Sequence, residues 1–84
     1  MSMPKNWIIN YAKNMTKDDM YKYIKNNNIN IKDDDVDTIY DHIKKYYNVF
    51  FDDPIKYIKM LKGKIEDNIY YEILTIYDNY KNYI

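Results

Sequence analysis

Apolar residues recur at α-helical spacing along nearly the whole chain, and no segment shows the strict alternation of a half-buried strand. We therefore expect an all-α fold, a small irregular bundle of four to five short helices, with residues 1–84 forming a single helical domain. Residues 1–3 are expected to lie outside the fold, either disordered or added ahead of a natural start at Met3. The expected helices cover residues 4–15, 17–26, 33–47, 54–62 and 66–83, and the C-terminal helix is expected to be the longest.

The predicted helix boundaries depend on capping residues. Thr16, followed closely by two aspartates, is typical of a helix start, because its hydroxyl accepts a bond from a free backbone N–H and the carboxylates favour the helix dipole. Asp53 before Pro54 is a second such start. Gly63, the only glycine, is expected to end the helix before it, because glycine adopts the left-handed conformation without steric cost.

The polar stretch NNNINIKDDD, residues 26–35, is predicted to separate two helices. Asparagines tolerate the left-handed conformation at a helix end, and Asp33 places acids in the first turn of the next helix. Ile29 and Ile31 alternate with polar neighbours, so we expect both side chains to reach the core.

Residues 48–53 are predicted to be a loop whose aromatic side chains plug the core beneath it. Lys44 and Lys45 would then lie in the last turn of the preceding helix, where the dipole favours cations. The predicted core comprises the Trp7 face of the first helix (Trp7, Ile8, Tyr11, Ala12 and Met15) together with Ile24, Ile39, Ile43, Ile58, Leu61, Ile69, Ile73 and Ile76.

The last predicted helix has two neighbouring apolar rows along its surface. One row is Ile69, Ile73, Ile76 and Tyr80, and the other is Tyr70, Leu74 and Tyr77. Because this arc is wider than one packing partner requires, we expect the helix to be central to the bundle or shared with another molecule, as in a homodimer.

The composition is 46% hydrophobic, which indicates a globular chain, and it is rich in Lys, Asn, Ile and Tyr. These residues have A/T-rich codons, so the bias indicates an AT-rich genome. The absence of Cys fits a reducing compartment, and the apolar runs are too short for a membrane span or a signal peptide. We therefore expect a cytoplasmic protein that does not enter a membrane.

Asp33, Asp35 and Asp37 match the opening positions of an EF-hand calcium loop. The pattern then fails, because Thr38 stands where the glycine turn belongs and Lys44 stands where the bidentate glutamate belongs. The acids fit better as a helix N-terminus, so no metal site is predicted.

The sequence offers little for catalysis. His42 is the only histidine, which excludes a cluster of several histidines around a metal, and neither Cys nor a glycine-rich phosphate loop is present. Because catalysis needs activated nucleophiles or acid–base pairs, we expect a non-enzymatic protein with no catalytic residues and no cofactor.

Twelve tyrosines in 84 residues are more than a core can satisfy, since each buried hydroxyl needs a hydrogen-bond partner. Tyrosine also makes rigid contacts at protein interfaces. We therefore expect a protein–protein interaction module whose candidate interface comprises Tyr46, Tyr47, Phe50, Phe51, Tyr70, Tyr71, Tyr77 and Tyr80.

Lysines interleaved with tyrosines give the alternative function, a nucleic-acid-binding accessory protein. Its candidate contacts are Lys22, Lys25, Lys44 and Lys45. Zero net charge and the absence of Arg argue against this alternative, because nucleic-acid binders usually carry a basic surface.

Two resemblances follow from these motifs. The first is carried by Trp7-Ile8-Ile9-Asn10, residues 15–20, Tyr23, Ile24, Ile29, Ile31, residues 36–39 and Asp53-Pro54. With these residues the chain resembles a family of short uncharacterised helical proteins of low-GC Gram-positive bacteria, which implies an all-helical fold and no particular activity. The second covers residues 16–43, where helix, extended connector and helix are similar to DNA-binding modules of the SAP type. The basic residues of those modules are replaced here by acids at positions 33–37.

Overall fold

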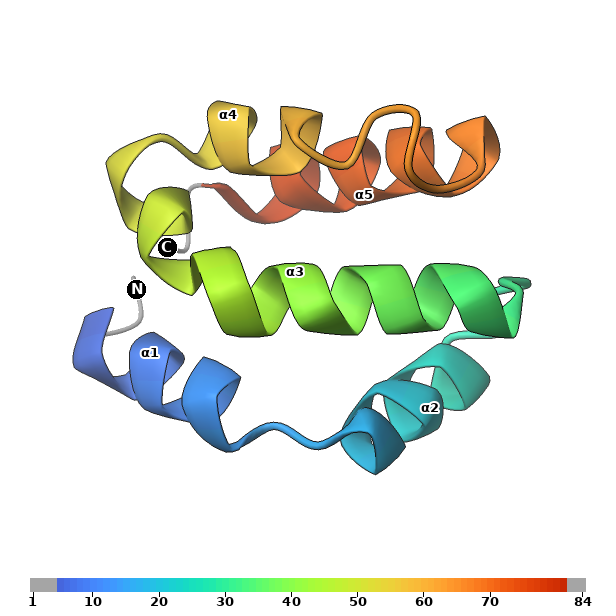
Figure 1. Ribbon diagram of the computed structural model, residues 1–84, viewed down its shortest axis with the longest axis horizontal. Helices are drawn as coiled ribbons and strands as arrows, with labels where there is room; N and C mark the ends of the chain where they lie inside the picture. Colours follow the sequence, from blue (N-terminus) through green and yellow to red (C-terminus); the bar gives the residue numbers. More distant parts are fainter. Residues whose placement is uncertain (1–4, 82–84) are drawn as a thin grey trace.

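The computed structural model describes residues 5–81, with Tyr80 described by its backbone alone. It contains the helices α1 (Lys5–Asn14), α2 (Lys17–Asn26), α3 (Asp33–Asp52), α4 (Pro54–Lys59) and α5 (Asp67–Tyr80). Between residues 5 and 81 there is no β-strand. The prediction of a small all-α fold of four to five helices is therefore confirmed (Figure 1). Pro4, Tyr83 and residues 1–3 lie outside the described residues.

The longest helix is α3, with 20 residues, and it crosses the middle of the molecule with α1 and α2 on one side and α4 and α5 on the other (Figure 1). The expectation that the C-terminal helix would be longest is therefore wrong, as is the predicted loop over residues 48–53. Phe50 and Phe51 continue the helical rows of Tyr46 and Tyr47 by one more turn, and all four side chains are at least half-buried. The helix ends only at Asp52, because Asp53 precedes a proline and so avoids the helical conformation (φ −156°, ψ 85°).

Two of the predicted helix starts act as expected, whereas α4 ends at Lys59, before the predicted stop at Gly63. Thr16 and Asp19 form a capping box: the Asp19 N–H donates to Thr16 Oγ1 at 3.1 Å, and the Thr16 N–H donates to Asp19 Oδ2 at 2.9 Å. Asp53 Oδ1 accepts from the Lys56 N–H at 3.1 Å. Gly63, in the turns that follow α4, has φ +81°, which is the conformation that favours glycine.

The core is formed by side chains of α4, the α4–α5 connection and α5. Its buried side chains are Ile58, Leu61, Ile65, Ile69 and Tyr70, and those of Ile29, Ile31 and Ile39 pack against them. Val36 of α3 is also buried, with 1% of its surface exposed. The two connector isoleucines therefore reach the core, as the polar stretch predicted.

Trp7 does not belong to the core, because 55% of its side chain is exposed. The α1 helix turns Ala12, which is buried, together with Ile8 and Ile9 toward its neighbours. Trp7 is therefore left on the outer flank of α1, where its ring stacks on that of Tyr11 at a centroid distance of 6.0 Å.

Lys44 and Lys45 do not lie in a last helical turn, because α3 continues to Asp52. The Lys44 Nζ instead donates to the carbonyl oxygens of Ala12 at 2.9 Å and of Lys13 at 2.7 Å. These are carbonyls at the C-terminal end of α1, where a cation is favoured by the helix dipole. Lys44 thus fastens α1 to α3.

Candidate protein-binding groove

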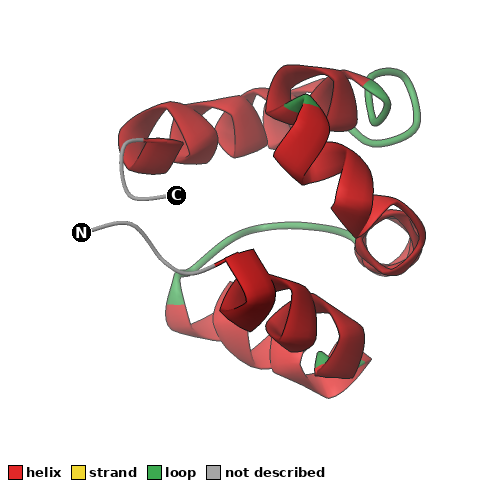
Figure 2. Cartoon of the chain, turned by 90° about the vertical axis from the view of Figure 1, so that its left-hand side faces the viewer, coloured by secondary structure: helices red, strands yellow, loops and turns green. Residues whose placement is uncertain are grey.

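An apolar groove separates the two sides of the molecule. The α1 and α2 helices pack against α3, and α4 packs against both α3 and α5, but within residues 5–81 the backbone of α5 comes close to neither α1 nor α2. Figure 2 shows the two groups of helices apart, with α3 seen nearly end-on. The space that side chains leave between them is a groove of about 310 Å³.

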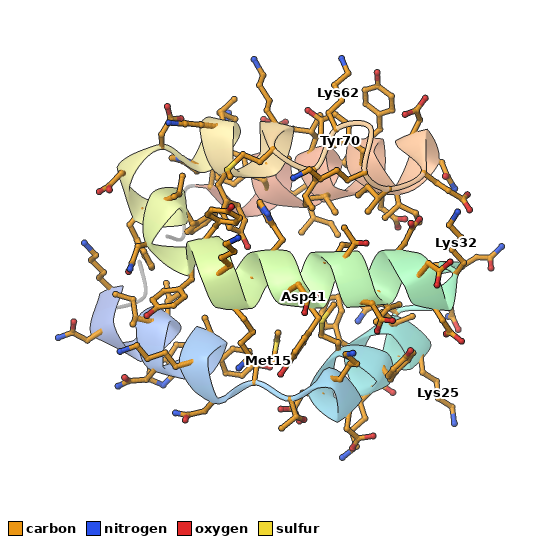
Figure 3. The ribbon with its side chains drawn as sticks, in the orientation of Figure 1. Met15, Lys25, Lys32, Asp41, Lys62 and Tyr70 are labelled. Atoms are coloured by element: carbon orange, nitrogen blue, oxygen red, sulfur yellow. The ribbon has the colours of Figure 1, made fainter. Side chains whose placement is uncertain are left out.

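Side chains from four helices and two connectors line this groove. They are Tyr11, Met15, Asp19, Met20, Tyr23, Ile24, Ile29, Ile31, Ile39, Ile43, Ile69, Glu72, Ile73 and Ile76. Figure 3 shows the Met15 side chain directed from the end of α1 toward α3. Apart from Asp19 and Glu72, the lining consists of aliphatic, methionine and tyrosine side chains.

The groove follows from helical periodicity. Ile69, Ile73 and Ile76 recur at i, i+4 and i+7, so they lie along one face of α5. Ile69 is buried by the core, whereas Ile73 and Ile76 are only half-buried. The two apolar rows predicted for this helix therefore separate: Tyr70, Leu74 and Tyr77 pack into or against the core, and Ile73 and Ile76 of the other row line the groove.

The apolar surface continues beyond the groove onto α1. Tyr11, Met15 and Asp19 also line an adjoining shallow hollow together with Trp7, Asn10 and Asn14. Trp7 and Tyr11 are more than half exposed. Large exposed apolar side chains beside an apolar groove are characteristic of surfaces that bind other proteins.

Three acids near the start of α3, Asp33, Asp35 and Asp37, each bind a different partner. Asp33 Oδ1 accepts from the Tyr21 hydroxyl at 3.3 Å, and Asp37 Oδ1 lies 2.8 Å from the Lys17 Nζ. Asp35, only 3% exposed, accepts the Glu66 N–H at 3.0 Å through Oδ2 and so caps the start of α5. Among the described residues no cluster of three or more potential metal ligands forms. The acidic stretch therefore ties α2 and α5 to α3.

His42 is held inside the fold and is 6% exposed. Its Nε2 lies 2.7 Å from the Tyr57 carbonyl oxygen, which only accepts, so this nitrogen carries the proton. Burial lowers the pKa of His42, against the opposing effect of that hydrogen bond. Burial also raises the pKa of the Tyr57 phenol to about 12. This imidazole packs against two tyrosine rings, of Tyr46 at 5.2 Å and Tyr57 at 4.5 Å.

The tyrosines and phenylalanines proposed as an interface do not form one surface. The Phe50 ring packs edge-on against Phe51 at 5.4 Å, against Tyr57 at 5.5 Å and against Tyr77 at 6.2 Å. This internal aromatic cluster joins α3, α4 and α5.

The remaining members of that set are dispersed. Tyr70 is buried, Tyr46 and Tyr47 are half-buried, and Tyr71 is 57% exposed. The Tyr80 side chain lies outside the described part of the structure. Aromatic residues of this set serve mainly as internal packing.

The four candidate nucleic-acid contacts are also dispersed. Lys22 and Lys25 are exposed on α2, and Lys22 pairs with Asp18 at 3.3 Å. Lys44 is occupied by the α1 carbonyls, and the Lys45 Nζ lies over the Tyr46 ring at 5.4 Å. No observation favours a continuous basic face over residues 16–43.

Sequence reasoning assigned the groove isoleucines to the core and therefore missed the groove. Ile24, Ile39, Ile43, Ile73 and Ile76 were all expected inside, yet each is half-buried. The signal that could have revealed it was the second apolar row of the last helix, which is more apolar surface than one packing partner covers.

Comparison with protein-family models, with curated proteins and with solved structures finds no match to this chain. The resemblances drawn from its motifs therefore stay predictions. None of the helices within residues 5–81 has the length and apolar character needed to cross a membrane.

Proposed function

We propose that this chain is a non-enzymatic protein-interaction module of the cytoplasm, and that its groove receives an amphipathic helix of a protein partner. The observation that carries this proposal is the groove of about 310 Å³, which is lined almost entirely by apolar side chains. A soluble chain gains by covering such a surface, because apolar area in contact with water is unfavourable.

A helix fits this groove better than the other common peptide conformations. Addition of a strand needs a free sheet edge, and the described residues contain no strand. Polyproline segments dock on grooves lined by aromatic rings, whereas this groove is lined mainly by isoleucine and methionine. Apolar anchors at i, i+3, i+4 and i+7 on a partner helix would fit between the rows of α2, α3 and α5.

The expected affinity is modest. Burying the part of a groove isoleucine that is still exposed contributes on the order of 0.5 to 1 kcal/mol. The cost of association and of ordering the partner helix offsets much of the free energy gained by such contacts, so binding should be weak. Interaction of this strength suits a partner that binds and leaves.

A titration with a designed peptide tests the proposal. The peptide carries leucine at i, i+3, i+4 and i+7 and uncharged glutamine elsewhere. We expect chemical-shift changes in the isotope-labelled protein to concentrate at groove residues, including Ile24, Ile39 and Ile73. If the peptide does not bind at concentrations up to about 1 mM, the proposal is refuted.

Two variants of α5 separate groove binding from non-specific adhesion. Ile76→Lys places a charge in the groove, and we expect it to weaken peptide binding at least about tenfold. Thr75→Lys adds the same charge one residue away, on an exposed position outside the groove lining, and is expected to leave binding within about twofold. Equal effects of the two substitutions would contradict the assignment of the groove.

Self-association through the C-terminal helix is the other use of the same face, because Ile73 and Ile76 lie on α5. Sedimentation equilibrium distinguishes this case. A homodimer would appear at micromolar concentrations and would be lost in Ile76→Lys, whereas a module for another protein remains monomeric.

A further inference from the structure

We infer that the partner helix is basic, with Lys or Arg flanking its apolar anchors. This inference rests on the proposed function, since it names the chemistry of the helix that the groove would receive. The charged side chains that line the groove are Asp19 and Glu72, one from α2 and one from α5, and no lysine of the described chain is among the lining residues.

The two acids come from the two opposite walls of the groove. Asp19 accepts the Thr16 N–H through one carboxylate oxygen, and this hydrogen bond lowers its pKa. Glu72 is exposed on α5, one residue before Ile73. A helix lying between the walls would therefore have a carboxylate on each side of its apolar face.

The lysines near this surface are engaged elsewhere. Lys44 and Lys22 make only small contributions to the lowered pKa of Asp19. The Lys44 ammonium group binds the α1 carbonyls, and that of Lys22 binds Asp18. Figure 3 shows Lys25, Lys32 and Lys62 directed away from the molecule. Although the chain has 13 lysines and 13 acids, the charged side chains that line its groove are thus acids alone.

A basic helix would complement this arrangement in the way that other helix-binding grooves use charge to select partners. Exposed ion pairs contribute little individually, so charge is expected to set preference and not the bulk of the affinity. Two pairs correspond to a preference of about three- to tenfold for a basic peptide over a neutral one.

Three peptides with the same leucine face and with Lys, Gln or Glu at the flanking positions test the inference. Dissociation constants are measured by fluorescence anisotropy of labelled peptides at about 50 mM and 300 mM salt. We expect the Lys peptide to bind the most tightly and the Glu peptide the least, with the differences shrinking at the higher salt.

A matched pair of charge reversals provides the control. Glu72→Lys is expected to abolish most of the preference for the Lys peptide and to improve binding of the Glu peptide. Asp52→Lys makes the same change of charge at an exposed position outside the groove lining, and is expected to preserve the order of the three peptides.

The possible failures are distinguishable. Binding of all three peptides within about twofold of one another would overturn the basic partner and leave the proposed function standing. Absence of binding by all three would refute both. A wild-type chain that sediments as a dimer, and as a monomer in Ile76→Lys, would overturn the inference by assigning the groove to a second copy.

Discussion

Asp35 connects two parts of the chain that lie 31 residues apart. Its removal should lower the free energy of unfolding more than the removal of any neighbouring acid. Its carboxylate accepts the Glu66 N–H at 3.0 Å and is almost fully buried. Glu66 precedes α5 and provides no side-chain cap of its own. The Asp35→Ala substitution therefore leaves a partly buried N–H at a helix start without this acceptor.

The magnitude follows from the hydrogen bond and its surroundings. A bond to a charged acceptor contributes about 1.5 to 3 kcal/mol, and loss of a helix cap alone costs about 0.5 to 2 kcal/mol. We expect Asp35→Ala to lower the free energy of unfolding by about 2 to 3 kcal/mol. For a domain of this size that corresponds to a fall in Tm of roughly 8 to 20 °C. Asp35→Asn keeps an oxygen acceptor and should cost less.

Urea denaturation followed by circular dichroism measures the effect. Asp34→Ala is the matched control, because Asp34 lies in the same helical turn and is exposed, so its loss should change stability by less than about 0.5 kcal/mol. If Asp35→Ala and Asp34→Ala unfold within 0.5 kcal/mol of each other, the interhelical cap is not a source of stability and the reasoning is refuted.

Other predictions concern Lys44, His42 and Gly63. Lys44→Met should cost about 1 to 2 kcal/mol in urea denaturation, because two charge-assisted hydrogen bonds to α1 are lost, whereas Lys45→Met should change little. Burial places the pKa of His42 below its unfolded value, so the folded chain binds fewer protons. Stability should therefore fall as the pH drops through about 6.5, and His42→Gln should flatten this slope between pH 7.5 and 5.5 in urea denaturation. Gly63→Ala should cost about 1 kcal/mol in thermal melts through left-handed strain alone, since no atom lies within 4 Å of the added Cβ; an unchanged Tm would contradict this.

The local elements of this protein were determined by its sequence alone. Thr16, the Asp53-Pro54 pair and Gly63 act on backbone groups within a few residues, so their effect does not depend on distant parts of the chain. The all-α class follows for the same reason, because helical hydrogen bonds and apolar periodicity are both local in sequence.

The length of α3 depends on contacts with distant parts of the chain. Residues 48–52 carry aromatic side chains that suit either a loop or a helix, and the choice of helix coincides with packing of Phe50 against Tyr57 and Tyr77. The roles of Asp35 and Lys44 likewise depend on backbone groups 31 to 32 residues away. No local pattern specifies such partners.

The groove is the feature that only the tertiary structure decided. The sequence identifies Ile24, Ile39 and Ile73 as apolar positions on helical faces, but it does not say how far apart the helices will lie. Because α5 packs on α4, and not on α1 or α2, these side chains are left half-buried along an open groove. Burial depends on the distance between helices, which is set by every contact in the fold together.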